Sequence, residues 1–132
     1  MKSQLELAVE KHLRAVLRVL AAEPADQEQA YAPFCPVREL PSEFDHWSGV
    51  WLGSYAPADA VVRRNALAAI EAGLDALSEA ERACSDPELL DSPGWTRVRK
   101  ASRGALLAFG WSRLPLPRQI KTSKGIYREE TE

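Results

Sequence analysis

Apolar residues recur every three or four positions in three long stretches of this 132-residue chain, a spacing typical of helices with one buried face. The first stretch predicts a helix from about Gln4 to Ala22, because Ser3–Glu6 has the S-x-x-E form of a capping box and Pro24 stops the helix. The apolar stripe of this helix comprises Leu5, Val9, Leu13, Val16, Leu17 and Leu20.

The second stretch, Ala58–Cys84, is the longest run without proline and predicts a central helix. Pro57 suits a first helical turn, and Asp59 complements the positive end of the helix dipole. Gly73 falls on the apolar stripe, and we expect another element to cross closely there, since glycine costs about 1 kcal/mol in a helix interior. The stripe comprises Val62, Ala66, Ala69, Ile70, Leu74, Leu77, Ala80 and Cys84.

The third stretch predicts a helix over about Pro93 to Phe109, opened by Ser92 and ended by Gly110. Its buried stripe comprises Trp95, Val98, Ser102, Ala105, Leu106 and Phe109. Across the three stretches, the expected core residues are Leu13, Leu17, Ile70, Leu74, Leu77, Leu106 and Phe109.

Short elements connect these helices. Single helical turns are expected at 26–31 and 86–90, and a short helix at 41–47. The glycine-punctuated aromatic residues 47–55 predict an irregular segment that packs over the helices. The chain is therefore expected to be all-α, a compact bundle of three long helices plus short helical turns. Residues 1–118 form a single domain in this prediction, and 119–132 form a partly ordered tail, basic and then acidic, with a minor β-hairpin as the alternative.

Composition narrows the classes to which the chain can belong. The 45% hydrophobic content suffices for a core, but no apolar run is long enough for a membrane span. The charged first helix does not resemble a signal peptide. Two cysteines are too few for a disulfide scaffold. We therefore expect Cys35 and Cys84 to be free thiols in a reducing, cytoplasmic compartment, with a single bridge between them as the less favoured alternative.

Charge is distributed unevenly along the chain. Residues 1–91 contain sixteen acidic and eight basic residues, a net of −8, whereas 92–128 contain nine basic residues and no acidic one. Three glutamates follow, and the whole chain has a net charge of −2. This asymmetry is the strongest indication of function in the sequence, because segregated charge is typical of interaction surfaces.

Signatures of catalysis are missing from the sequence. His12, Cys35, His46 and Cys84 are scattered, whereas metal sites need three or four suitably spaced ligands. Asp45 adjoins His46, but neighbours on a helix point to different sides. No glycine-rich phosphate loop follows a strand. We expect no enzyme activity, no catalytic residue, no cofactor and no metal.

Two binding functions remain. The preferred one is a protein-binding module, most concretely an immunity protein or antitoxin that covers the basic surface of a toxin such as a nuclease. Glu71, Asp75 and Glu79 stand four residues apart and form one ridge of the predicted central helix. The candidate partner-binding residues are Glu71, Asp75, Glu79, Glu39, Glu43 and Asp45.

The alternative is nucleic-acid binding through the basic segment 92–128. No helix-turn-helix or other docking signature supports this reading. A third interpretation needs no partner, because Arg99 and Arg103 could pair internally with the acidic residues of the central helix. The candidate nucleic-acid-binding residues are Arg97, Arg99, Lys100, Arg103, Arg113, Lys121 and Lys124.

Overall fold

Helices account for all the regular structure that the computed structural model describes, within residues 1–31, 34–84 and 87–117. The five α-helices and two 3-10 helices are α1 (Gln4–Leu20), α2 (Pro24–Tyr31), α3 (Pro36–Ser54), α4 (Val61–Asp75), η1 (Ala80–Arg82), η2 (Pro87–Asp91) and α5 (Pro93–Phe109). They pack into a compact all-α bundle, as predicted. The expected tail and its alternative hairpin lie outside the described residues.

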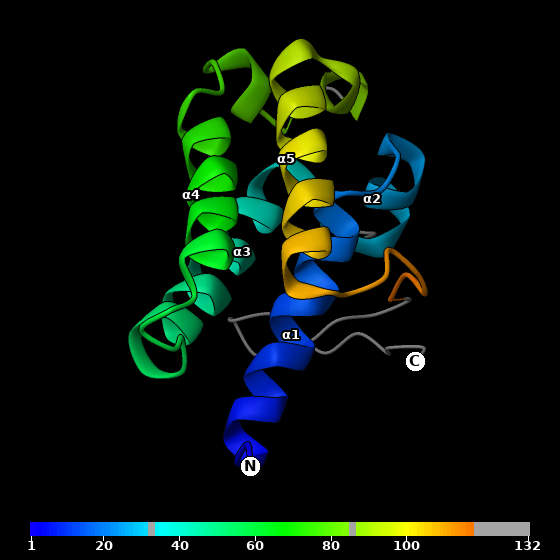
Figure 1. Ribbon diagram of the computed structural model, residues 1–132. Helices are drawn as coiled ribbons and strands as arrows, with labels where there is room; N and C mark the ends of the chain where they lie inside the picture. Colours follow the sequence, from blue (N-terminus) through cyan, green and yellow to red (C-terminus); the bar gives the residue numbers. More distant parts are fainter. Residues whose placement is uncertain (32–33, 85–86, 118–132) are drawn as a thin grey trace.

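The helices pack mainly in two pairs, α4 along α5 and α1 along α3, and α1 also contacts α5 (Figure 1). The first turns of α1 extend beyond the other helices in the same view. Leu5 is therefore 72% exposed, although its spacing predicts burial, because none of the described helices reaches that end of α1. From Val9 onward the apolar stripe of α1 is buried.

The ends of α1 and α5 follow the capping signals in the sequence. The Glu6 backbone N–H donates to Ser3 Oγ at 3.1 Å, and Ser92 Oγ accepts from the Trp95 N–H at 3.4 Å. Gly110 ends α5 in the left-handed region, with φ of 71°, which a residue without a Cβ adopts at little cost. The predicted bounds of α5 are confirmed.

The predicted central helix is wrong in length, because α4 covers only Val61–Asp75 of the expected Ala58–Cys84. Ser78 and Glu81 form a reciprocal capping box that starts η1, with N–H to side-chain oxygen distances of 3.0 and 3.1 Å. Serine competes with helix continuation by bonding nearby backbone groups. The Arg82 guanidinium then binds the last carbonyls of α4, Leu74 O at 3.2 Å and Asp75 O at 2.6 Å.

The aromatic segment 47–55 is also predicted wrongly, because α3 runs unbroken from Pro36 to Ser54, with Pro41 inside it. Gly49 and Gly53 lie on its exposed side and touch no other element. Burial of one continuous face therefore outweighs the helix-breaking residues. The buried face carries Val37, Leu40, Phe44, Ser48 and Trp51 at helical spacing.

The core lies between the helix pairs and includes nearly all the residues expected there. Of the seven predicted core residues, Phe109 is partly buried and the other six are buried. Gly73 marks the close crossing that its position predicts. A Cβ on Gly73 would lie 3.2 Å from Val98 Cγ2 of α5, a contact so tight that Val98 would have to shift by a few tenths of an ångström.

A disulfide joins Cys35 to Cys84, so the prediction of free thiols is wrong. Cys35 is the residue before α3, and Cys84 follows η1; their Cα atoms are 5.9 Å apart across a sequence separation of 49. Folding brings the two cysteines together, which their distant places in the sequence do not indicate. The predicted reducing compartment stays a prediction.

Candidate functional site

The acidic ridge, defined here as Glu71, Asp75 and Glu79, is exposed on the outer side of the α4 region. Helix α4 buries the face that carries Leu67, Ile70 and Leu74. Glu71 and Asp75 lie outside this face and are exposed to solvent. Glu79 lies just beyond the helix, in the residue before η1. Within the described residues, none of the three carboxylates has a hydrogen-bond or ion-pair partner.

The second predicted acidic group, Glu39, Glu43 and Asp45, contains two buried residues and one exposed residue. Glu39 and Glu43 are only 4% and 0% exposed, whereas Asp45 is exposed. Both glutamates occupy the face of α3 that packs into the bundle, and Trp47 Nε1 donates to Glu43 Oε2 at 3.1 Å. Burial removes Glu39 and Glu43 from any surface on which a partner can dock, so the candidate face reduces to the acidic ridge and Asp45.

Arg99 and Arg103 do not pair with the acidic ridge, because they bind carbonyls that directly follow α1, and Arg99 also binds a carbonyl of η2. Arg99 Nε donates to Ala22 O at 2.8 Å, and its Nη2 donates to Leu90 O at 2.7 Å. Arg103 Nε donates to Ala21 O at 3.0 Å. The carbonyls at the end of a helix have no donor within the helix. The two arginines supply donors here, so the alternative interpretation, in which they pair with the acidic residues of the central helix, is wrong.

Gln27 completes this cap from α2. Its Nε2 donates to Val19 O and Leu20 O, both at 3.1 Å, while its Oε1 accepts from Arg99 Nη2 at 3.4 Å. Burial lowers the pKa of Arg99 from its ordinary value, yet a guanidinium stays protonated in proteins. Arg99 is 6% exposed, so it is a structural cation and cannot reach a phosphate outside the bundle.

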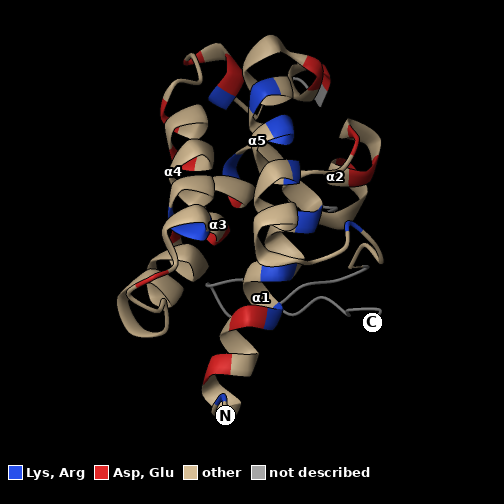
Figure 2. Cartoon of the chain, in the orientation of Figure 1, with Lys and Arg blue, Asp and Glu red and all other residues tan. Residues whose placement is uncertain are grey.

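The remaining basic candidates differ in position. Arg97, Lys100 and Arg113 are exposed, whereas Lys121 and Lys124 lie outside the described residues. Figure 2 shows basic positions along α5 with no acidic position among them. Helix α4, which packs beside α5, carries charges of both signs: the half-buried Arg63 and Arg64 near its start and the exposed Glu71 and Asp75 toward its end.

Glu81 is an organising carboxylate that the sequence reading missed. Its Oε1 accepts from the Ser78 N–H at 3.0 Å, and its Oε2 accepts from the Gly94 N–H at 2.8 Å and from Ser92 Oγ. These hydrogen bonds, led by the one from Ser78, lower the pKa of Glu81 to about 2. A Cβ on Gly94 would collide with the carboxylate. The S-x-x-E spacing of Ser78 and Glu81 is the signal that could have revealed this capping role.

The two histidines lie beside one ring. His12 stacks on Trp47 with ring centroids 4.3 Å apart, and His46 meets the same indole edge-on at 4.6 Å. Both imidazoles therefore contact an indole that is itself packed against the core. Among the described residues, no group of three or more histidine, cysteine or acidic side chains could hold a metal ion.

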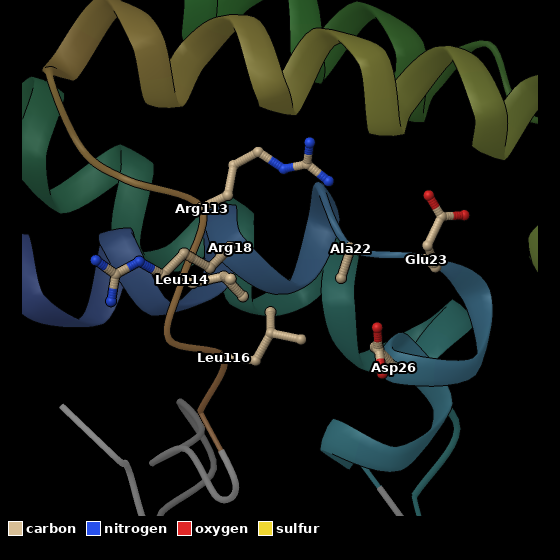
Figure 3. Close-up of a pocket in the computed structure, with 7 residues that line it drawn as sticks. All are labelled: Arg18, Ala22, Glu23, Asp26, Arg113, Leu114 and Leu116. Atoms are coloured by element: carbon tan, nitrogen blue, oxygen red, sulfur yellow. The ribbon is translucent and has the colours of Figure 1, made fainter.

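A cavity of about 370 Å³ is a further feature that the sequence did not indicate (Figure 3). It lies where the end of α1 and the start of α2 face the segment that follows α5. No motif connects these distant segments, so only folding creates the cavity. Its lining residues are Arg18, Ala22, Glu23, Asp26, Arg113, Leu114 and Leu116.

No protein-family model, curated protein or solved structure matches the chain. In the part that the structure describes, no helix has the length and apolar character needed to cross a membrane. Any assignment of function therefore depends on the surfaces and side chains described above.

Proposed function

We propose that this chain is a protein-binding module whose acidic ridge contacts a basic partner surface. The observation that carries the proposal is that Glu71, Asp75 and Glu79 are exposed and have no partner among the described residues. Carboxylates that stabilised the fold would be paired or buried, as Glu10 is with Lys2, at 2.7 Å. A row of like charges whose carboxylates bind no side chain of the described residues supports a role in attracting an oppositely charged surface.

The position of two ridge residues on a rigid helix supports the same proposal. Glu71 and Asp75 are one turn apart on α4, which the Gly73–Val98 crossing holds closely against α5. A rigid helix loses less conformational entropy on binding than a loop does. Charges presented in this way accelerate encounter and select partners by sign.

The concrete version of the proposal is an inhibitor, such as an immunity protein or antitoxin that covers the basic cleft of a toxin that cleaves nucleic acid. Such a cleft must be basic to hold phosphates, and an acidic ridge is complementary to it. Only the charge and rigidity of the ridge support this version.

Charge reversal tests the proposal. Cross-linked complexes are captured from an extract of the native host with the wild type, with E71K/D75K, and with the control E28K/D59K, which changes the net charge equally at exposed sites elsewhere. We expect E71K/D75K to lose a basic partner that the wild type and the control retain, most clearly at low salt. Equal recovery of that partner by all three proteins would show that the ridge is only solvated.

Nucleic-acid binding stays the second candidate, favoured by the exposed Arg97 and Lys100 on the acid-free helix α5. The burial of Arg99 removes one of its main residues. A gel shift with duplex DNA at low salt separates the two functions. R97E/K100E would abolish a specific shift in this second case, whereas the protein-binding proposal predicts no shift for the wild type.

A further inference from the structure

The cavity beside the end of α1 is separate from the acidic ridge and has the dimensions of a small-molecule site. Its volume of about 370 Å³ lies in the range of roughly 300–1,000 Å³ that is usual for ligand pockets. Three chain segments form it: the end of α1 with Ala22, the start of α2, and residues 113–116 after α5.

The walls combine an apolar surface with charges of both signs. In Figure 3, Leu114 and Leu116 enter from the segment after α5 and face Ala22, while Arg113 lies along one side and Asp26 along another. An apolar centre flanked by a few polar groups is the usual composition of a site that orients a small ligand. The charges of opposite sign come from different elements, so a ligand that meets both must carry its own charges at separate positions.

Two of the four charged groups are already used within the fold. Arg18 Nε donates to Ser112 O at 2.9 Å and its Nη2 donates to Ser112 Oγ at 3.2 Å. Glu23 pairs with Arg103 at 2.9 Å. The Arg113 guanidinium and the Asp26 carboxylate, by contrast, have no hydrogen-bond or ion-pair partner within residues 1–31, 34–84 and 87–117.

The groups already in use hold the walls in place. Arg18, 7% exposed, ties the segment after α5 to α1 through Ser112 and through Pro115 O at 3.4 Å. The opposite wall is held by Arg103, which binds Ala21 O and Glu23 together. Walls fixed in this way lower the entropy cost of binding, because little of the site has to become ordered.

We propose that this cavity binds a short peptide with free ends and apolar side chains. Its terminal carboxylate pairs with Arg113, its terminal ammonium pairs with Asp26, and its side chains pack on Leu114 and Leu116. A fatty acid would leave Asp26 without a partner, and a simple amine would leave Arg113 without one. A dipeptide with apolar side chains carries a carboxylate, an ammonium and an apolar surface in one molecule, which matches the three kinds of group in the walls.

Titration with matched ligands tests this proposal. The probe is the dipeptide Leu-Leu; N-acetyl-Leu-Leu lacks the ammonium, and Leu-Leu amide lacks the carboxylate. Binding is followed by amide chemical shifts in nitrogen-15-labelled protein, with shifts expected at Ala22, Asp26 and Leu116. Each blocked end should weaken binding about fivefold, the upper range for a partly exposed ion pair.

Two substitutions test which residue binds each end of the ligand. R113Q should bind Leu-Leu and its amide equally while still discriminating against the acetylated form, and D26N should show the reverse pattern. R97Q and E28Q, which neutralise exposed charges outside the cavity, should leave all three affinities unchanged.

Three results would overturn the proposal. The first is no saturable shift for the wild type with Leu-Leu up to about 10 mM, well beyond a Kd of roughly 1 mM that corresponds to about −4 kcal/mol. The second is an equal effect of R113Q or D26N on all three ligands. The third is equal affinity for O-phosphoethanolamine, a headgroup zwitterion without apolar side chains, because the apolar walls would then have no role.

Discussion

Loss of the Cys35–Cys84 disulfide should destabilise the protein by about 4 kcal/mol. The bond closes a loop that spans a sequence separation of 49 residues. In the chain-entropy model, a cross-link over a loop of that length removes roughly 14 cal/mol/K from the unfolded state, which is about 4 kcal/mol at 25 °C. That amount is a large part of the roughly 5–15 kcal/mol typical of a domain.

Urea unfolding with and without dithiothreitol measures the effect. With a denaturant slope of about 2 kcal/mol/M, typical of small proteins, the midpoint should fall by about 2 M when the bond is reduced. The double variant C35A/C84A should match the reduced wild type under both conditions. Alanine is preferred to serine at position 35, because Cys35 precedes α3 and a serine there would add a helix cap.

Counting reactive thiols tests whether the disulfide forms, independently of any effect on stability. Protein purified without reductant should show no thiol that reacts with Ellman's reagent, even in denaturant. Two reactive thiols would show that the bond does not form, and the cytoplasmic expectation would gain support, since disulfides are rare in reducing compartments. A bond that forms but changes the midpoint by less than about 0.5 M would refute the entropic reasoning.

Two further predictions concern groups that organise the bundle. R99M should lower the free energy of unfolding by about 2–4 kcal/mol, because it leaves the buried carbonyls of Ala22 and Leu90 without donors. The exposed control R97M should change the free energy of unfolding, measured with urea, by less than about 0.5 kcal/mol. Equal effects of the two substitutions would contradict the capping role of Arg99. Glu81 has a folded-state pKa of about 2, below its ordinary value of 4.5, so its contribution to stability is fully present above pH 4.5 and is lost as the pH falls toward 2. The stability difference between the wild type and E81Q, followed by chemical unfolding across this range, should therefore shrink with acidification; a difference independent of pH would show that the charge of Glu81 contributes nothing.

Local signals in the sequence determined the helices whose ends are capped by neighbouring residues. Ser3, Ser92 and Gly110 act within one turn of their own helix, so the start of α1 and both ends of α5 follow from adjacent residues. The all-α class and the crossing at Gly73 follow from the spacing of apolar residues for the same reason. Each of these features needs only a pattern that repeats every three or four residues.

The tertiary structure decided the features that depend on distant segments. Helix α3 forms through Pro41 because burying the face with Phe44 and Trp51 outweighs a local penalty. The disulfide, the arginine cap on α1 and the cavity each unite residues from separate elements. Arg99 shows the reason most clearly. Its spacing along α5 allows several partners, and only the packing of α5 on both the end of α1 and η2 places its donors at the carbonyls of Ala22 and Leu90.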